Sequence, residues 1–124
     1  MLMAVAAGGA FGAVGRFLVM SGAGHFIGHG FPYGTMIVNI AGSFILGSLV
    51  EISALVWSPS EEMRAFLVVG CLGAFTTFSA FSMDAMFLWS RGEWVSGGLY
   101  IVLSVSFGIA AFVAGMAVFR AILG

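Results

Sequence analysis

The chain has 124 residues, of which 61% are hydrophobic and only 7% are charged, with a net charge of −1 and no lysine. A water-soluble domain carries about 25% charged residues, so this composition excludes an ordinary soluble fold and favours one domain, residues 1–124, that faces lipid. No basic patch is present, which excludes nucleic acid as a partner.

Four stretches are long and apolar enough to cross a bilayer, since a spanning helix needs about 20 mostly apolar residues. They run from about Leu2 to Ala23, from Tyr33 to Trp57, from Met63 to Trp89 and from Trp94 to Leu123. Three of these limits are tryptophans, and indole prefers the membrane–water interface. The sequence therefore predicts an all-α, multi-pass membrane protein with four transmembrane helices.

The first stretch contains an arginine, Arg16, and several glycines, among them Gly8 and Gly12. An ionisable side chain inside a membrane is a functional candidate, and small residues allow helices to pack closely. His25 and His29 follow at a spacing of four residues, but no third ligand accompanies them, so a metal site is not expected there.

The second and fourth stretches each carry one isolated polar residue of interest, Asn39 and Ser104. A polar side chain in hydrocarbon needs a partner, and a helix–helix hydrogen bond is the ordinary solution. The alternative is that each side chain lines a polar pathway through the membrane. The spacing alone leaves both interpretations open.

The third stretch is interrupted by a polar run, Gly73-Ala74-Phe75-Thr76-Thr77-Phe78-Ser79-Ala80-Phe81-Ser82. Glycine followed by two β-branched threonines weakens a helix, so the run is compatible with a break near its middle. The alternative is a continuous helix whose hydroxyls bond back to the preceding turn. A break would free carbonyls for a cation and amides for an anion. The rings of Phe78 and Phe81 share a helix face, with their positive edges suited to an anion.

The arginines are balanced across the membrane. Four spans place both termini on one side with Arg64 and Arg120, whereas Arg91 and Arg16 belong to the other side or the interior. The positive-inside rule therefore gives no preferred orientation. We expect both orientations to occur, and an antiparallel, dual-topology homodimer to form.

Three motifs resemble those of the Fluc (CrcB) fluoride channels. The motifs are Gly8-Gly9 with Gly12-Ala13 and Arg16-Phe17, then Gly34-Thr35 with Val38-Asn39 and Gly42-Ser43-Phe44, and then Gly70 and Gly73 with Phe75-Thr76-Thr77-Phe78-Ser79-Ala80-Phe81-Ser82. Their order covers the whole chain, and the third motif is long and specific. Where some relatives have Glu, this chain has Asp84.

The resemblance implies a passive, fluoride-selective channel that exports fluoride across the cell (inner) membrane and works as an antiparallel dimer. It also implies that the third helix is broken near its middle, and that a sodium ion at the dimer centre is bound by main-chain carbonyls of this break, at Gly73 and Thr76. The pore residues that it implies are Asn39, Thr77, Phe78, Ser79, Phe81, Tyr100 and Ser104, with Arg16 in the vestibule.

Two other functions compete with a channel. A small dual-topology multidrug/proton antiporter has four spans and weak charge bias, but it needs an acidic residue in the first helix, where this chain has none. A purely structural membrane subunit would explain the glycines but not the Thr/Phe/Ser run. No catalytic set of side chains is visible, so an enzyme is not expected.

Overall fold

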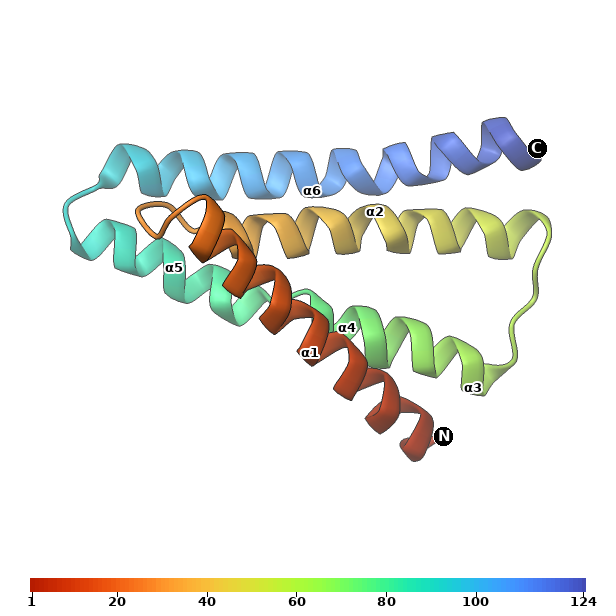
Figure 1. Ribbon diagram of the computed structural model, residues 1–124. Coiled ribbons are helices and arrows are strands. Elements are labelled where there is room, and N and C mark those ends of the chain that lie inside the picture. The colour runs from red at the N-terminus through yellow and green to blue at the C-terminus, as the bar shows by residue number, and fades with distance from the viewer.

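The computed structural model describes all 124 residues, and every regular element is a helix (Figure 1). The elements are α1 (Leu2–Phe26), α2 (Tyr33–Leu55), α3 (Glu61–Arg64), η1 (Ala65–Leu72), α4 (Gly73–Phe75), α5 (Phe78–Ser90) and α6 (Trp94–Leu123). Four helical spans, counting α3 to α5 as one, are long and apolar enough to cross a membrane. The all-α, multi-pass prediction is confirmed, and the first span continues three residues beyond Ala23, the limit expected from the sequence.

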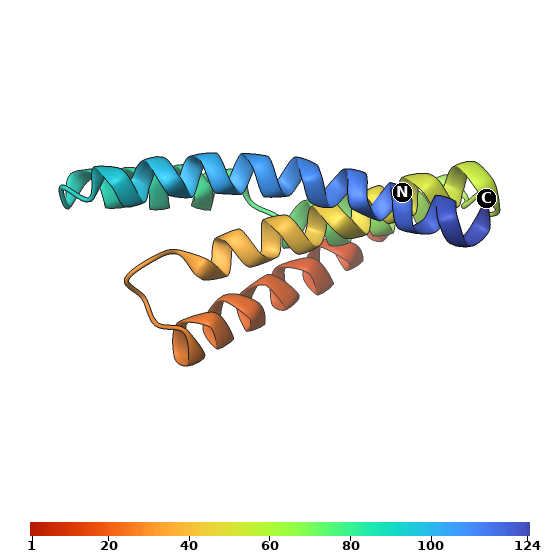
Figure 2. The same ribbon diagram turned by 90° about the horizontal axis from the view of Figure 1, so that it is seen from above.

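The spans alternate in direction, so both termini lie at the same end of the molecule (Figure 1). Helix α2 lies between α6 and α1 (Figure 2). Since α6 and α2 both start at the other end, they run parallel to each other, while α1 packs mainly on the first half of the third span.

Glycines sit where helix backbones touch. On α1, a Cβ added to Gly8 would collide with the carbonyl oxygen of Phe66, and one on Gly12 with that of Cys71. Where α2 meets α6, a Cβ on Gly47 would collide with the carbonyl oxygen of Phe112. In lipid, where apolar burial gives helices little reason to associate, such close contact supplies the attraction. The packing role expected for the glycines is confirmed at these positions.

The third span is a composite. It starts as a short α-helix capped by Ser60, whose side chain accepts a hydrogen bond from the amide of Met63 at 3.1 Å. It then widens into a π-helix over Ala65–Leu72, which the sequence did not lead us to expect. After α4 the backbone is extended at Thr76 (ψ 158°) and Thr77 (φ −152°), and α5 begins at Phe78. The expected break is confirmed, and these two conformations exclude a continuous helix.

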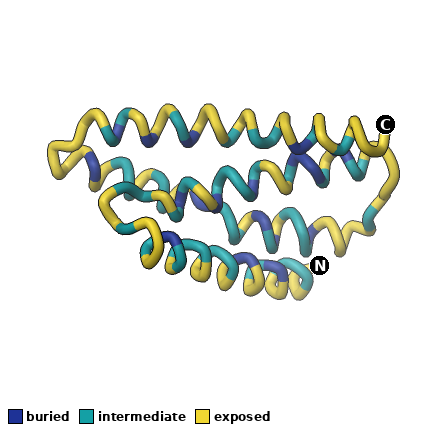
Figure 3. Tube along the Cα trace, turned by 45° about the horizontal axis from the view of Figure 1, so that its top comes forward, coloured by how far each residue is buried: buried dark blue, intermediate teal, exposed yellow.

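Few residues are buried within the chain. Only 18 of 124 are, and large apolar side chains are exposed along every span. Exposed residues, coloured yellow in Figure 3, occur along all of the helices. A single copy in water would leave these side chains in contact with solvent at a large free-energy cost. The surface therefore requires lipid, another protein chain, or both.

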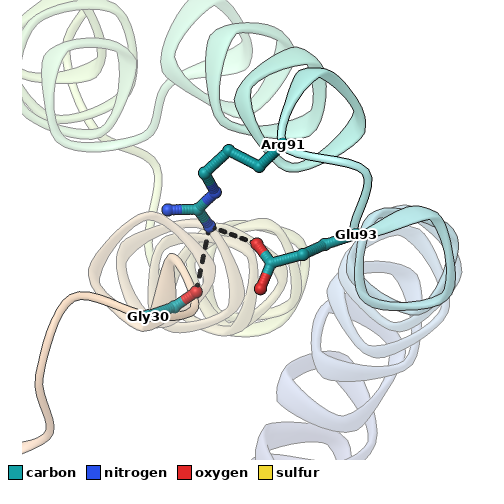
Figure 4. Close-up of polar contacts among 3 residues, drawn as sticks. All are labelled: Gly30, Arg91 and Glu93. Atoms are coloured by element: carbon teal, nitrogen blue, oxygen red, sulfur yellow. Dashed lines mark hydrogen bonds and ion pairs between the residues drawn. The ribbon is translucent and has the colours of Figure 1, made fainter.

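Arg91 connects the two loops at the end of the molecule opposite the chain termini. Its guanidinium Nη2 donates a hydrogen bond to the carbonyl oxygen of Gly30 at 3.2 Å and lies 2.7 Å from the Glu93 carboxylate (Figure 4). The turn between α5 and α6 needs Gly92, whose φ of +79° is in the left-handed region. The contact joins this turn to the loop between α1 and α2.

The opposite end holds a charge in an enclosed position. The carboxylate of Glu51, on α2, is 3% exposed and accepts a hydrogen bond from Arg120 Nε at 2.9 Å. Arg120 lies in the last turn of α6, where a cation also meets the negative end of the helix dipole. The pair connects α2 to α6 near the chain termini.

Candidate functional site

Seven of the ten residues that the sequence singled out line one groove of about 440 Å³. The seven are Asn39, Gly73, Thr76, Thr77, Phe78, Phe81 and Ser104. They come from α2, from the break and its two flanking helices, and from α6. The fold thus places the second and fourth spans, α2 and α6, beside the interrupted part of the third span.

The break ends one helix and starts another within two residues. Thr76 closes the first half, because its hydroxyl donates to the carbonyl oxygen of Leu72 at 2.9 Å, alongside its own amide at 3.0 Å. Thr77 caps the second half, because its hydroxyl accepts from the amide of Ala80 at 3.0 Å. The negative end of one helix dipole and the positive end of the other therefore adjoin.

Asn39 holds the break from α2. Its Oδ1 accepts from the Thr77 amide at 2.7 Å, and its Nδ2 donates to the Thr77 carbonyl oxygen at 3.0 Å. Asn39 makes an inter-helix hydrogen bond and also lines the groove, so the structure is compatible with both roles that the sequence left open. One N–H of the amide makes no hydrogen bond within the chain.

Several backbone groups at the break have no partner in the chain. The carbonyl oxygens of Gly73 and Thr76 accept no hydrogen bond, and the amides of Phe78 and Ser79 donate none. Unpaired peptide groups are costly away from water, so such groups are retained where a ligand or water meets them. Carbonyl oxygens suit a hard cation, and amides at a helix start suit an anion.

Aromatic rings continue from the break along α5 to α6. The Phe78 and Phe81 ring centroids are 5.6 Å apart, and those of Phe81 and Tyr100 are 5.2 Å apart. Phe78 is 69% exposed, whereas Tyr100 is fully buried. Tyr100 therefore supports Phe81 from behind and does not line the groove itself.

A polar cluster of Thr35, Asp84 and Tyr100 lies next to these rings, and sequence analysis did not predict that the three would meet. Tyr100 donates its hydroxyl to Asp84 Oδ2 at 3.2 Å, and Thr35 donates to the same oxygen at 2.6 Å. Thr35 is 1% exposed and was missed as a candidate. Its spacing, one helical turn before Asn39 in an otherwise apolar run, was the available signal.

The hydroxyl of Ser104 is the one buried side-chain polar atom without a hydrogen-bond partner. Ser104 is 9% exposed and lines the groove. A buried unsatisfied hydroxyl costs about 1–3 kcal/mol, so its position favours a ligand that accepts a hydrogen bond. Ser79, in contrast, is exposed on α5 and lies 3.2 Å from the Thr77 hydroxyl.

Arg16 lies on the α1 side of the break and not in the groove. Its Nε donates to the carbonyl oxygen of Ala74 at 3.0 Å, and its side chain is half-buried. Gly42, on α2, permits the opposite approach, because a Cβ there would collide with the Thr76 methyl group. Helices α1 and α2 therefore contact the break from two sides, α1 through the Arg16 side chain and α2 at Gly42.

Comparison with known proteins gives a consistent assignment. Residues 3–116 match the family model described as CrcB-like protein, Camphor Resistance (CrcB). The chain is 47% identical to the "Fluoride-specific ion channel FluC" of Rhodospirillum centenum, over 97% of this chain and 95% of the relative. It is 49% identical to the protein of the same name from Rhizobium johnstonii, over 95% of this chain and 94% of that one. The protein of that name from a Chelativorans species is 48% identical, over 98% of both chains.

Proposed function

The chain belongs to the CrcB family, and on that premise we propose that it is a passive, fluoride-selective channel of the cell membrane that lets toxic fluoride leave the cell. One observation carries the proposal. A single groove beside the helix break combines the partnerless Ser104 hydroxyl, a free Asn39 N–H and the Phe78 and Phe81 rings. All are uncharged groups that offer positive edges or protons to an anion.

The chemistry of this groove suits fluoride. The ion is small and strongly hydrated, so a pathway must replace its water by compact donors such as hydroxyl and amide groups. Conduction also requires that the ion leave, and aromatic edges bind it weakly enough to allow exit. No arginine lines the groove, so no full positive charge traps the anion there.

A multidrug/proton antiporter is not supported. The relatives are named as fluoride-specific channels, and α1 contains no aspartate or glutamate that could exchange a proton for a cationic drug.

Fluoride efflux from proteoliposomes tests the proposal. Purified protein in vesicles loaded with sodium fluoride, with a sodium ionophore present to carry the compensating charge, is expected to release fluoride, measured with a fluoride-selective electrode. Vesicles loaded with sodium chloride and the same ionophore are expected to release no chloride, measured with a chloride-selective electrode. Protein-free vesicles are the control. Absence of fluoride release from folded, reconstituted protein would refute the channel.

Replacing either groove phenylalanine by isoleucine is expected to slow fluoride efflux by roughly tenfold or more, because isoleucine fills similar volume but has no positive ring edge. Phe78→Ile and Phe81→Ile are compared with Phe107→Ile, whose ring is 52% exposed on α6 and outside the groove. Unchanged efflux in both groove variants would contradict the aromatic role.

A second copy completes the groove in our proposal, as an antiparallel homodimer. Two features support it. Phe78 is 69% exposed although it lines the groove, and the arginines favour neither orientation in the membrane. With one wall of the groove missing, one chain leaves the pathway incomplete, whereas a partner inserted in the opposite sense brings a second break to the same depth.

We further propose that the dimer centre holds a sodium ion. The carbonyl oxygens of Gly73 and Thr76 fit this role chemically, because both are hard oxygen donors without a hydrogen bond in the chain. A two-fold axis between copies would double the set. The ion would join the two breaks and neutralise the free carbonyls.

Removing sodium is therefore expected to shift the dimer towards monomers, because the carbonyls would then face each other uncompensated. Size-exclusion chromatography with light scattering in sodium chloride and in N-methylglucamine chloride at equal ionic strength measures the shift. A dimer equally stable in both salts would contradict the sodium site while leaving the efflux result untouched.

A further inference from the structure

We propose that Arg16 is a positioning residue, which holds the end of α4 through the Ala74 carbonyl and thereby sets which carbonyls of the break stay free, instead of meeting the anion in a vestibule. The inference rests on the proposed function, because it concerns the break that the proposed channel uses. In this proposal the glycines of α1 let the helix pack closely enough for Arg16 to reach the end of α4.

Helix α1 packs closely against the first half of the third span. Gly8 and Gly12 touch the backbone at Phe66 and Cys71, where any side chain would collide. One turn further, a Cβ added to Gly15 would lie 3.5 Å from the ring of Phe75, an ordinary contact. Because backbone meets backbone at the first two positions, the next residue on this face of α1 reaches the end of α4.

That residue is Arg16. Its Nε lies 3.0 Å from the Ala74 carbonyl oxygen, one of the terminal carbonyls that α4 cannot satisfy within its own helix. The guanidinium makes no ion pair with a carboxylate. Its charge is instead set against the negative end of a helix dipole, a favourable arrangement where little water is present.

Helices α1 and α2 bind different backbone groups at the break. Arg16 occupies the Ala74 carbonyl from α1, and Asn39 occupies both backbone groups of Thr77 from α2. The carbonyls that remain without a donor in the chain are those of Gly73, Phe75 and Thr76. If Ala74 lost its donor, only the two hydrogen bonds from Thr76 to Leu72 would still hold the end of α4, and the orientation of the free carbonyls would be less fixed.

Two substitutions separate positioning from charge. In Arg16→Gln, the side-chain amide nitrogen takes the same place along the chain as Nε, so an N–H donor remains and the charge is lost. Arg16→Met has a methyl carbon at that place and offers neither donor nor charge. Arg16→Lys keeps the charge and is the control for an electrostatic role.

Hydrogen–deuterium exchange of the peptide that covers residues 72–82 reports on the break without requiring conduction. We expect Arg16→Met to exchange roughly tenfold faster than the parent protein there, as the loss of a charge-assisted hydrogen bond permits, and Arg16→Gln to stay within about threefold. Fluoride efflux and the sodium concentration that retains half of the dimer are expected to follow the same order.

Equal behaviour of Arg16→Gln and Arg16→Met, whether both are impaired or both resemble the parent, overturns the inference. If Arg16→Met does not fold, the decision falls on Arg16→Gln: slow exchange and retained efflux support positioning, and impairment with Arg16→Lys intact overturns it. If the parent protein passes no fluoride, the proposed channel fails, yet the exchange comparison still tests the contact with Ala74.

Discussion

Replacing Asn39 with alanine is expected to reduce fluoride efflux at least roughly tenfold and to destabilise the fold, because both backbone groups of Thr77 lose their only partner. Each buried peptide group left unpaired costs about 1–3 kcal/mol, and two are left unpaired here. Relief of that cost requires Thr76 and Thr77 to move, which displaces the start of α5 and the Phe78 and Phe81 rings. Efflux from proteoliposomes and the thermal unfolding midpoint measure the two effects.

An aspartate at the same position is the matched control. Asn39→Asp keeps an oxygen that accepts from the Thr77 amide but has no N–H for the Thr77 carbonyl, so an intermediate loss of stability is expected. Its negative charge beside the groove would repel fluoride, so Asn39→Asp is expected to reduce fluoride efflux strongly although it loses less stability than Asn39→Ala. Alanine and aspartate variants that unfold and conduct like the parent would show that the break is held by other contacts.

Removing the guanidinium of Arg120 is expected to lower the free energy of unfolding by about 2 kcal/mol, because the Glu51 carboxylate would be left unpaired at 3% exposure. The expected loss is smaller than for a fully enclosed pair, since the Arg120 side chain is 71% exposed and partly screened. Arg120→Leu is therefore expected to weaken the contact between α2 and α6 near the termini. Unfolding followed by tryptophan fluorescence in mild detergent gives the change.

The double variant separates the pair from its members. Glu51→Gln is uncharged and nearly the same shape, so Glu51→Gln/Arg120→Leu is expected to recover most of the stability lost in Arg120→Leu alone. Fluoride efflux at equal amounts of folded protein is expected to change little, because neither residue lines the groove. A double variant as unstable as the sum of the two singles would show that the carboxylate and guanidinium act independently.

The local sequence made a break possible, because glycine and β-branched threonine both weaken a helix, but it left a continuous helix open until the family resemblance favoured the break. The structure places the extended residues at Thr76 and Thr77. The π-helix was not predictable in the same way, because the residues of Ala65–Leu72 are compatible with an ordinary α-helix. This segment packs closely on α1, where a Cβ added to Gly70 would collide with the Cα atom of Gly8.

The partners of the polar residues depend on the fold and not on local sequence. Asn39 and Thr77 are 38 positions apart, and Arg16 and Ala74 are 58 apart, so no spacing rule pairs them. The sequence could mark each side chain as needing a partner in lipid. It could not show that both would bind the backbone of the same break, because that requires α1 and α2 to approach it from different sides.

The meeting of two helix ends at Thr76 and Thr77 has a further consequence for how the site responds to its surroundings. The carbonyls that we propose to hold sodium, and the free amides at the start of α5, are peptide groups, which neither gain nor lose protons over the pH range in which cells live. The break thus presents opposite partial charges a few ångströms apart with no ionised side chain of its own. Acidification is therefore expected to leave the protonation of these peptide groups unaltered.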